Sequence, residues 1–296
     1  AAKWEQQSAE RGGSANLKWI KLGHAQEEDI KALVDRGIGF SDIFEAVGDV
    51  AVKVKPGMET AAAFLESRRY GALLGATSEF TKMEGVTHNA EDRKLYIAMS
   101  YIEAGMIDGQ NGERPQDHIR LKGDPRDLFC GGVYESALSG SQKDTTGETI
   151  RSDWVAVTMQ ARVLGARKPQ GQTVGQYDQC DTERMANPDN IKYSSEMRTL
   201  FIGEDSGLHL NNFLWAYNID SGSLTRILSA PAGAEHTGLQ VVTNINGHSY
   251  IMSNIQHPGA AGDLRQYPDV VKAGLRKQID QRGSVGYLGG LPVLQH

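Results

Sequence analysis

The chain has 296 residues, of which 39% are hydrophobic and 23% are charged, a balance typical of a globular protein. Its formal net charge is −6, so it lacks the positive surface that a nucleic-acid partner requires. No apolar run reaches 18 residues, so we expect no membrane-spanning helix.

The first third of the chain predicts one strand and two helices. Residues 14–23 alternate between apolar and polar side chains, which indicates a strand. Residues 27–38 have apolar side chains at helical spacing and acidic residues in the first turn, where the helix dipole favours them. Residues 58–76 form a second candidate helix, preceded by Pro56 and Gly57. We expect these helices to be scaffold.

After residue 80 the hydrophobic period changes from helical to alternating, and short apolar runs are separated by turn residues. Residues 216–228 read as a hairpin, because Asp220-Ser221-Gly222 suits a tight turn between two strands. We therefore expect a mainly β protein with helical insertions in the first third. Residues 1–258 would form the β domain, and residues 259–296 a polar, Gly-rich tail on its surface.

Two segments repeat each other with an offset of 105 residues. These are GVTHNAEDRKLYIAMS at 85–100 and NIKYSSEMRTLFIGED at 190–205. Each reads as strand, polar turn, strand, and a looser third copy occupies residues 238–254. Recurring strand-turn-strand units of this kind are typical of β-propeller blades, which must stack to bury their apolar faces. The alternative is a sandwich that contains three unrelated hairpins.

An acidic residue precedes each copy. Glu84 and Asp189 occupy the same register, Glu235 lies two or three residues early, and the second copy ends in Glu204 and Asp205. In a propeller, the first strand of each blade lines the central channel, so equivalent residues converge on one axis. Carboxylates gathered there repel unless they are protonated or neutralised by cations. We therefore expect a site for hard cations with oxygen ligands, such as Ca²⁺ or ferric iron.

Other motifs place few further constraints on function. His236 and His257 lie near the third copy, where either is a metal ligand or an ordinary polar residue. We find no HExxH, GxSxG or P-loop motif. Cys130 and Cys180 can pair in an oxidising compartment, stay reduced or bind a metal. The chain begins at Ala1 without a signal peptide, which predicts a processed or truncated product.

Five segments together resemble the PhoX-type alkaline phosphatases, a family of secreted bacterial β-propellers. They are FLESRRYGALLGATSEFTKMEGVT, ANPDNI, LFIGEDSG, GAEHTG and SNIQHPG, and the resemblance runs from about residue 60 to 260. It implies a six-bladed propeller in the complete protein, of which this chain supplies part. It also implies a periplasmic or secreted location.

The resemblance further implies that an axial cluster of ferric iron and calcium hydrolyses phosphate monoesters. Carried over by position, Glu84, Asp189, Asp205 and Glu235 are the expected metal ligands, and Arg184 is the candidate phosphate-binding cation. Because family members are longer, we expect another chain or an N-terminal segment to complete the ring. The competing hypothesis is a non-catalytic, calcium-binding propeller that acts as a surface or assembly protein.

Overall fold

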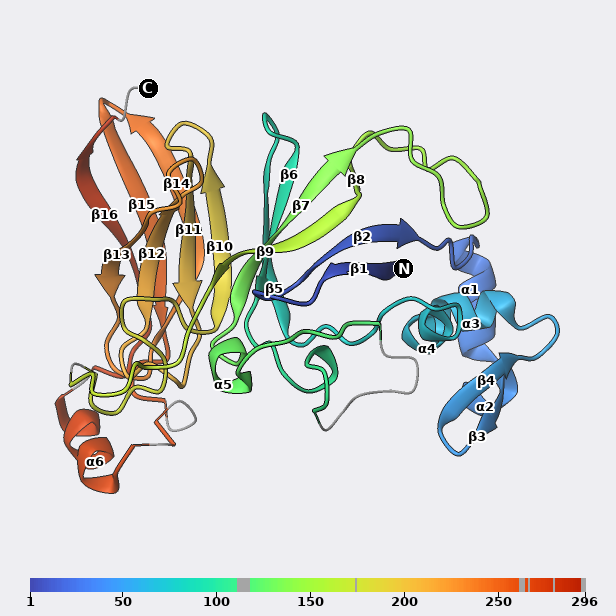
Figure 1. Ribbon diagram of the computed structural model, residues 1–296, viewed down its shortest axis with the longest axis horizontal. Helices are drawn as coiled ribbons and strands as arrows, with labels where there is room; N and C mark the ends of the chain where they lie inside the picture. The colour runs from blue at the N-terminus through green and yellow to red at the C-terminus, as the bar shows by residue number, and fades with distance from the viewer. Residues whose placement is uncertain (111–117, 174, 261–263, 266, 279, 294–296) are drawn as a thin grey trace.

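The protein is mainly β, with 40% of its residues in strands and 15% in helices. The computed structural model describes residues 1–110, 118–173, 175–260, 264–265, 267–278 and 280–293. Three antiparallel sheets stand side by side, and a group of short helices with a two-stranded ribbon lies at the N-terminal end (Figure 1). Among the described residues, no helix is both long enough and apolar enough to cross a membrane.

The first sheet has seven strands in the order β1-β2-β9-β7-β6-β5, with β8 paired to the end of β7. Its strands are β1 (Ala2–Ser8), β2 (Ser14–Trp19), β5 (Met83–Asn89), β6 (Lys94–Met99), β7 (Gly132–Ser139), β8 (Val155–Ala156) and β9 (Thr158–Leu164). The strand predicted at residues 14–23 is confirmed as β2. The sequence pattern did not reveal β1, which is mostly polar and pairs, among the described strands, with β2 alone.

The second sheet is a four-stranded meander in the order β10-β11-β12-β13. Its strands are β10 (Pro188–Ser194), β11 (Thr199–Glu204), β12 (Phe213–Asn218) and β13 (Leu224–Ser229). The hairpin predicted at residues 216–228 is confirmed as β12 and β13. Gly222 in its turn adopts φ +72°, a conformation that glycine enters without steric cost.

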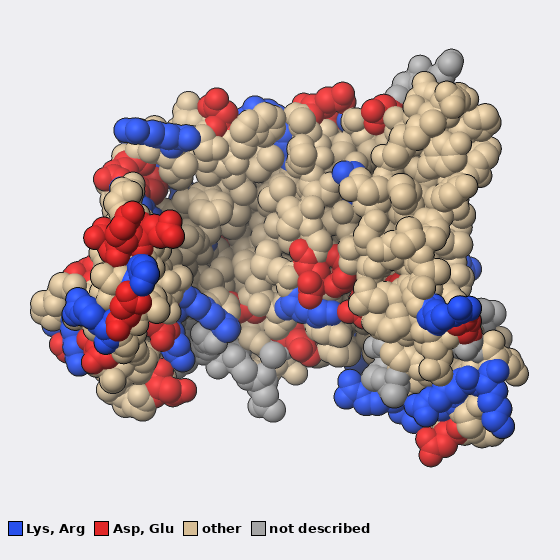
Figure 2. Space-filling model, turned by 180° about the vertical axis from the view of Figure 1, so that it is seen from behind, with Lys and Arg blue, Asp and Glu red and all other residues tan. Residues whose placement is uncertain are grey.

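The third sheet contains β14 (Glu235–Ile245), β15 (His248–Gln256) and β16 (Ser284–Pro292), in that order. The predicted polar tail at 259–296 therefore supplies a strand to this sheet as well as helix α6 (Asp269–Gln278). Residues 261–263, 266, 279 and 294–296 of that tail lie outside the described residues. Seen from behind, the surface over this sheet carries few charged side chains, whereas charges gather on the N-terminal helices and around α6 (Figure 2).

The N-terminal helices enclose a small core of their own. Their elements are α1 (Glu27–Asp35), α2 (Phe40–Ile43), α3 (Glu59–Leu65) and α4 (Ser67–Leu73), with the ribbon β3 (Phe44–Val47) and β4 (Val50–Val54). Two short helices, η1 (Ala104–Met106) and α5 (Pro125–Leu128), connect strands of the first sheet. The helix predicted at 27–38 is confirmed as α1. The one predicted at 58–76 is broken at Glu66, where the backbone leaves the helical region.

The two copies of the repeat form matching hairpins. In the first, Val86 pairs with Ile97, and in the second Ile191 pairs with Ile202, as the offset of 105 requires. The looser third copy pairs Val241 with Ile251. All three predicted strand-turn-strand units are therefore present, one in each large sheet.

Equivalent faces of successive sheets bury one another. Tyr96 of the first sheet packs on the second sheet and lies 5.9 Å from the ring of Tyr193. Its equivalent in the second sheet, Phe201, packs on Ile251 of the third. Glycine permits the close approach of the backbones, since a Cβ at Gly85 would stand 2.4 Å from the carbonyl oxygen of Asp189. Among the described strands, this stack stays open and does not close into a barrel or a ring.

Candidate functional site

Three of the four predicted acids surround one ammonium group. The Nζ atom of Lys82 lies 2.9 Å from Asp205 Oδ2, 3.8 Å from Glu84 Oε1 and 3.9 Å from Asp189 Oδ1. Glu84 belongs to β5, Asp189 to β10, and Asp205 follows β11. The predicted convergence of Glu84 and Asp189 is therefore present, with a lysine among the acids.

Bulges at the start of the inner strands help to place these carboxylates. The register of the first sheet shifts between Met83 and Val86, and that of the second shifts between Pro188 and Asn190. Glu84 and Gly85 lie inside the first shift, and Asp189 lies inside the second. A bulge bends a strand and re-aims the side chain that it carries. The same irregularity at the same position in two adjacent sheets thus turns both acids toward a common point.

Lys82 owes its place to the same repeat. Lys82 and Asn187 are equivalent under the offset of 105, and both adopt positive φ, +30° and +43° respectively. The carbonyl oxygen of Lys82 accepts a hydrogen bond from the N–H of Ser100, as that of Asn187 does from Asp205. The Lys82 ammonium also lies 5.2 Å from the centre of the Tyr101 ring, a cation–π contact.

The fourth predicted acid, Glu235, begins β14 in the third sheet and is buried. Its carboxylate is hydrogen bonded to Nε2 of His257. Burial raises its pKa, and the charges of Asp205 and Asp189 raise it further. Glu235 is therefore electrostatically part of the group, and we call Glu84, Asp189, Asp205 and Glu235 the acidic cluster.

Two members of the acidic cluster have raised pKa values. Burial raises the pKa of Asp189, the negative charge of Glu84 raises it further, and Lys82 opposes the shift. Burial and then the charge of Asp205 raise the pKa of Glu235, against the effect of His257. Although burial would lower the pKa of Lys82, its hydrogen bond and charge interaction with Asp205 raise it overall. Burial and the neighbouring carboxylates thus outweigh the effect of Lys82 on the pKa of Asp189.

A buried carboxylate holds the loop that carries Asp205. Glu204 is fully buried and accepts hydrogen bonds from the backbone N–H groups of Ala186 and Phe213 and from the indole of Trp215. It is also bonded to Nδ1 of the buried His209 at 3.0 Å. Charged acceptors with several donors are the form in which a carboxylate tolerates burial. Glu204, the other half of the predicted acid pair, therefore has a structural role.

Asn187 and a disulfide fix the segment that leads to Asp189. The side-chain amide of Asn187 donates to the carbonyls of Ser100 and Phe129 and accepts from the hydroxyl of Ser206. The disulfide joins Cys130 to Cys180, and the backbone N–H of Asn187 donates to the carbonyl of Cys130. Of the three states left open for the cysteines, the structure shows the disulfide.

Other polar residues named from the sequence take different places. Arg184 is exposed, and no ion pair among the described residues involves its side chain. His236 is buried and bonded through Nδ1 to Ser253, and burial lowers its pKa to about 4. His257, in contrast, reaches the cluster through Glu235. The sequence signals that could have found Lys82 are its equivalence to Asn187 and its position two residues before Glu84.

The chemistry of the acidic cluster suits a hard cation, because carboxylate oxygens are the ligands that Ca²⁺ and ferric iron accept. Within the described part of the chain, no group of three or more His, Cys, Asp or Glu side chains is close enough to share one metal ion. The acids instead surround the ammonium of Lys82. A cation that binds them must take the place of that ammonium, which is joined to the chain by a long and rotatable side chain.

Comparison with known protein families, with curated proteins and with solved structures finds no match to this chain.

Proposed function

We propose that the protein is a metal-dependent phosphatase that hydrolyses phosphate monoesters at the acidic cluster. The observation that carries this proposal is the convergence of Glu84, Asp189 and Asp205, from two adjacent sheets, on one positive charge. Raised pKa values at Asp189 and Glu235 mark a place where more cationic charge would be favourable. The sequence resemblance to the PhoX-type alkaline phosphatases supports the same reaction.

The architecture proposed for this activity is part of a β-propeller. Three hairpins in matching register, one at an edge of each sheet, are what consecutive blades require, as is the packing of the first sheet on the second and of the second on the third. In the complete assembly, the first strands would line an axis, and a further chain or segment would close the ring. Supporting this view, the outer face of the third sheet exposes Tyr287 and Val285, while the equivalent faces of the other sheets are covered.

Calcium and ferric iron are the proposed cofactors, with Glu84, Asp189, Asp205 and Glu235 as their ligands. When bound, such ions polarise phosphoryl oxygens and activate an oxygen nucleophile. The contribution of the chain is to gather the carboxylates and to keep part of their charge away from water. Lys82, once displaced from the acids, is the nearest ammonium available to hold the oxygens of a phosphate group.

Two further side chains have proposed roles toward the substrate. His257 is 40% exposed and is held by the buried Glu235, so its imidazole can give a proton to the leaving alcohol while its orientation is kept. Arg184, which was predicted from the sequence as the phosphate-binding cation, is exposed on the surface. Lys82 is the stronger candidate for that role, because it already lies within 4 Å of three of the acids.

The disulfide between Cys130 and Cys180 supports a proposal for the cellular compartment of the protein. Disulfides persist in oxidising surroundings such as the periplasm or the extracellular space. We therefore assign the protein to the periplasm or to secretion, in agreement with the family that it resembles. Its partner would be a small phosphate ester, with no nucleic acid involved.

A second candidate function is a calcium-binding surface or assembly protein without catalysis. The ammonium of Lys82 favours it, because this group balances part of the cluster's charge without any metal. In that case the acids would bind a structural cation.

Phosphate release from p-nitrophenyl phosphate separates the two functions. The wild-type protein and Asp189→Asn would be assayed after dialysis against Ca²⁺ and Fe³⁺, and bound metal would be measured in the same samples. A phosphatase releases phosphate only when it is metal-loaded, and Asp189→Asn abolishes the release. Bound metal without turnover would favour the calcium-binding alternative, and no bound metal in the wild type would contradict both functions.

A further inference from the structure

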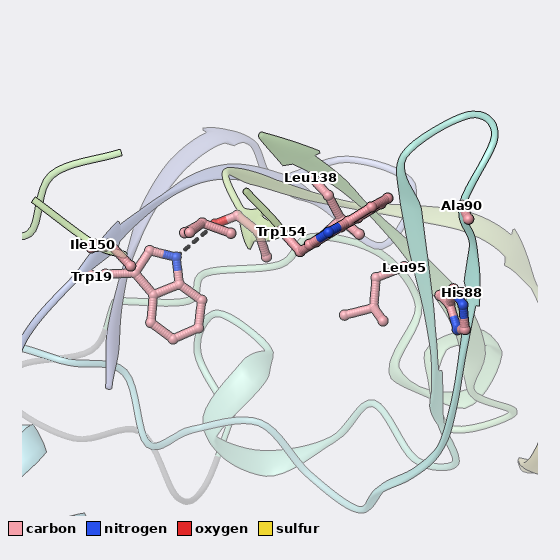
Figure 3. A pocket seen from close by; sticks show the side chains of 9 residues that line it. Trp19, His88, Ala90, Leu95, Leu138, Ile150 and Trp154 are labelled. Atoms are coloured by element: carbon pink, nitrogen blue, oxygen red, sulfur yellow. Dashed lines mark hydrogen bonds between the residues drawn. The ribbon is translucent and has the colours of Figure 1, made fainter. Parts of the chain in front are cut away.

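A pocket of about 640 Å³ lies on the outer face of the first sheet, away from the acidic cluster. Its lining includes Trp19 from β2, Leu95 from β6 and Trp154 from the loop before β8, with His88 and Ala90 at the β5–β6 hairpin. Figure 3 shows Trp19 at one end and His88 at the other, with Trp154 and Leu95 between them. A volume of this size is typical of small-molecule sites.

The repeat explains why there is space at this position. Leu95 is equivalent to Leu200 in the second sheet, where the first sheet covers Leu200 completely. Leu95 packs at the margin of the first sheet's own core and stays partly exposed to the pocket. Trp154, in the loop before β8, forms part of the lining.

Each indole has a partner that holds it in place. The Nε1–H of Trp19 donates to the carbonyl of Ala156 at 2.6 Å, the contact drawn in Figure 3. The guanidinium of Arg93 lies 4.5 Å from the centre of the Trp154 ring and donates to the carbonyls of Leu138 and Asp153. Trp154 is nevertheless 51% exposed. Aromatic surfaces that are fixed before a ligand arrives lose little conformational entropy on binding.

The lining selects an uncharged and apolar ligand. Among the described residues that line the pocket, none is Lys, Arg, Asp or Glu, and most are aliphatic or aromatic. A charged ligand would lose its hydration here without gaining an ionic partner. A flat ring, in contrast, can stack on an indole and bury its faces against Leu95 and Leu138.

The pocket is also distinct from the proposed catalytic site. Glu84 and His88 are both in β5, four residues apart, so their backbones are separated by about 13 Å along the strand. A ligand in the pocket therefore occupies a second site.

We infer that this pocket binds a neutral, ring-containing small molecule between Trp19 and Trp154, independently of the acidic cluster. The inference does not depend on the proposed phosphatase activity, but it requires that the segment proposed to close the ring leave this face of the first sheet uncovered.

The test is a fluorescence titration with N-phenyl-1-naphthylamine, a neutral aromatic probe, in the presence of EDTA. Wild-type protein should bind one probe molecule saturably. Trp154→Ala removes one aromatic wall, and Ala90→Trp fills the mouth from an exposed position, so each should weaken binding by about tenfold or more. Tyr287→Ala is the matched control, because it removes an aromatic residue that is 66% exposed on the third sheet, away from the pocket. This variant should bind the probe with the same affinity as the wild type.

Three results would overturn the inference. The first is the absence of saturable binding to the wild type, and the second is equal weakening by Tyr287→Ala and Trp154→Ala. The third is displacement of the probe as protein concentration rises, with dimer formation in sedimentation equilibrium, because a second copy of the chain would then occupy the pocket.

Discussion

Replacing Lys82 by methionine tests whether the acids truly depend on a cation. The substitution keeps an unbranched side chain and removes only the ammonium, which lies 2.9 to 3.9 Å from three carboxylates. Unit charges 4 Å apart interact by about 4 kcal/mol near a protein surface, and solvent screening reduces this toward about 1 kcal/mol for exposed pairs. The charged hydrogen bond to Asp205 adds about 1.5 kcal/mol. Allowing for the partial exposure of these groups, we expect a loss of about 2 kcal/mol in the free energy of unfolding at neutral pH.

The loss should depend on pH with a definite sign. Asp189 and Glu235 have raised pKa values in the folded state, so their protonation stabilises the fold at low pH. That contribution is lost as the pH rises through their folded pKa values. Because Lys82 lowers the pKa of Asp189, its removal raises this pKa further and makes the loss steeper. The free energy of unfolding of Lys82→Met should therefore approach the wild-type value when the pH is near the ordinary pKa of a carboxyl group. It should fall furthest below the wild-type value at neutral pH.

Urea denaturation in EDTA at acidic and neutral pH measures this effect, with Lys122→Met as the control. Lys122 is exposed, so the control removes the same charge from a site away from the cluster. Added Ca²⁺ should restore more stability to Lys82→Met than to the control. The reasoning is refuted if the two variants unfold at the same urea concentration at both pH values.

Three further changes test the framework around the site. Glu204→Gln should lower the free energy of unfolding, measured in urea, by about 3 kcal/mol, because the buried N–H donors lose their charged acceptor. A variant as stable as the wild type would contradict the structural role of Glu204. Gly203→Ala places a Cβ 2.3 Å from a carbonyl oxygen of the third sheet and should lower the free energy of unfolding by about 2 kcal/mol. Gly274→Ala is the control and should not lower it, because its Cβ would have no other atom within 4 Å. Reducing the disulfide between Cys130 and Cys180, which are 50 residues apart, should cost about 4 kcal/mol, and an unchanged melting temperature would count against it.

The repeat was the most informative feature of the sequence. Matching residue types at an offset of 105 predicted the hairpins that pair Val86 with Ile97 and Ile191 with Ile202. The same offset placed Glu84 and Asp189 at equivalent strand starts, and both acids come within 4 Å of Lys82. Periodicity and register are local properties, so the sequence alone can reveal them.

Features that depend on distant contacts escaped prediction. Lys82 reads as one more surface lysine until Asp205, 123 residues away, is brought to its side chain. The strand β16 lies in a polar, Gly-rich stretch, and pairing with β15 determines its conformation. The helix predicted over 58–76 breaks at Glu66, where φ −135° and ψ 39° lie outside the helical region, and the apolar spacing continues through this break without revealing it.

Terbium luminescence tests the central claim most directly, because Tb³⁺ takes the oxygen ligands of a hard cation and Tyr101 lies beside Lys82 as a sensitiser. We expect saturable emission from the wild-type protein, tighter binding to Lys82→Met and loss of emission in Asp189→Asn. Emission that is absent from the wild type, or that persists unchanged in Asp189→Asn, would show that the acidic cluster does not bind a hard cation.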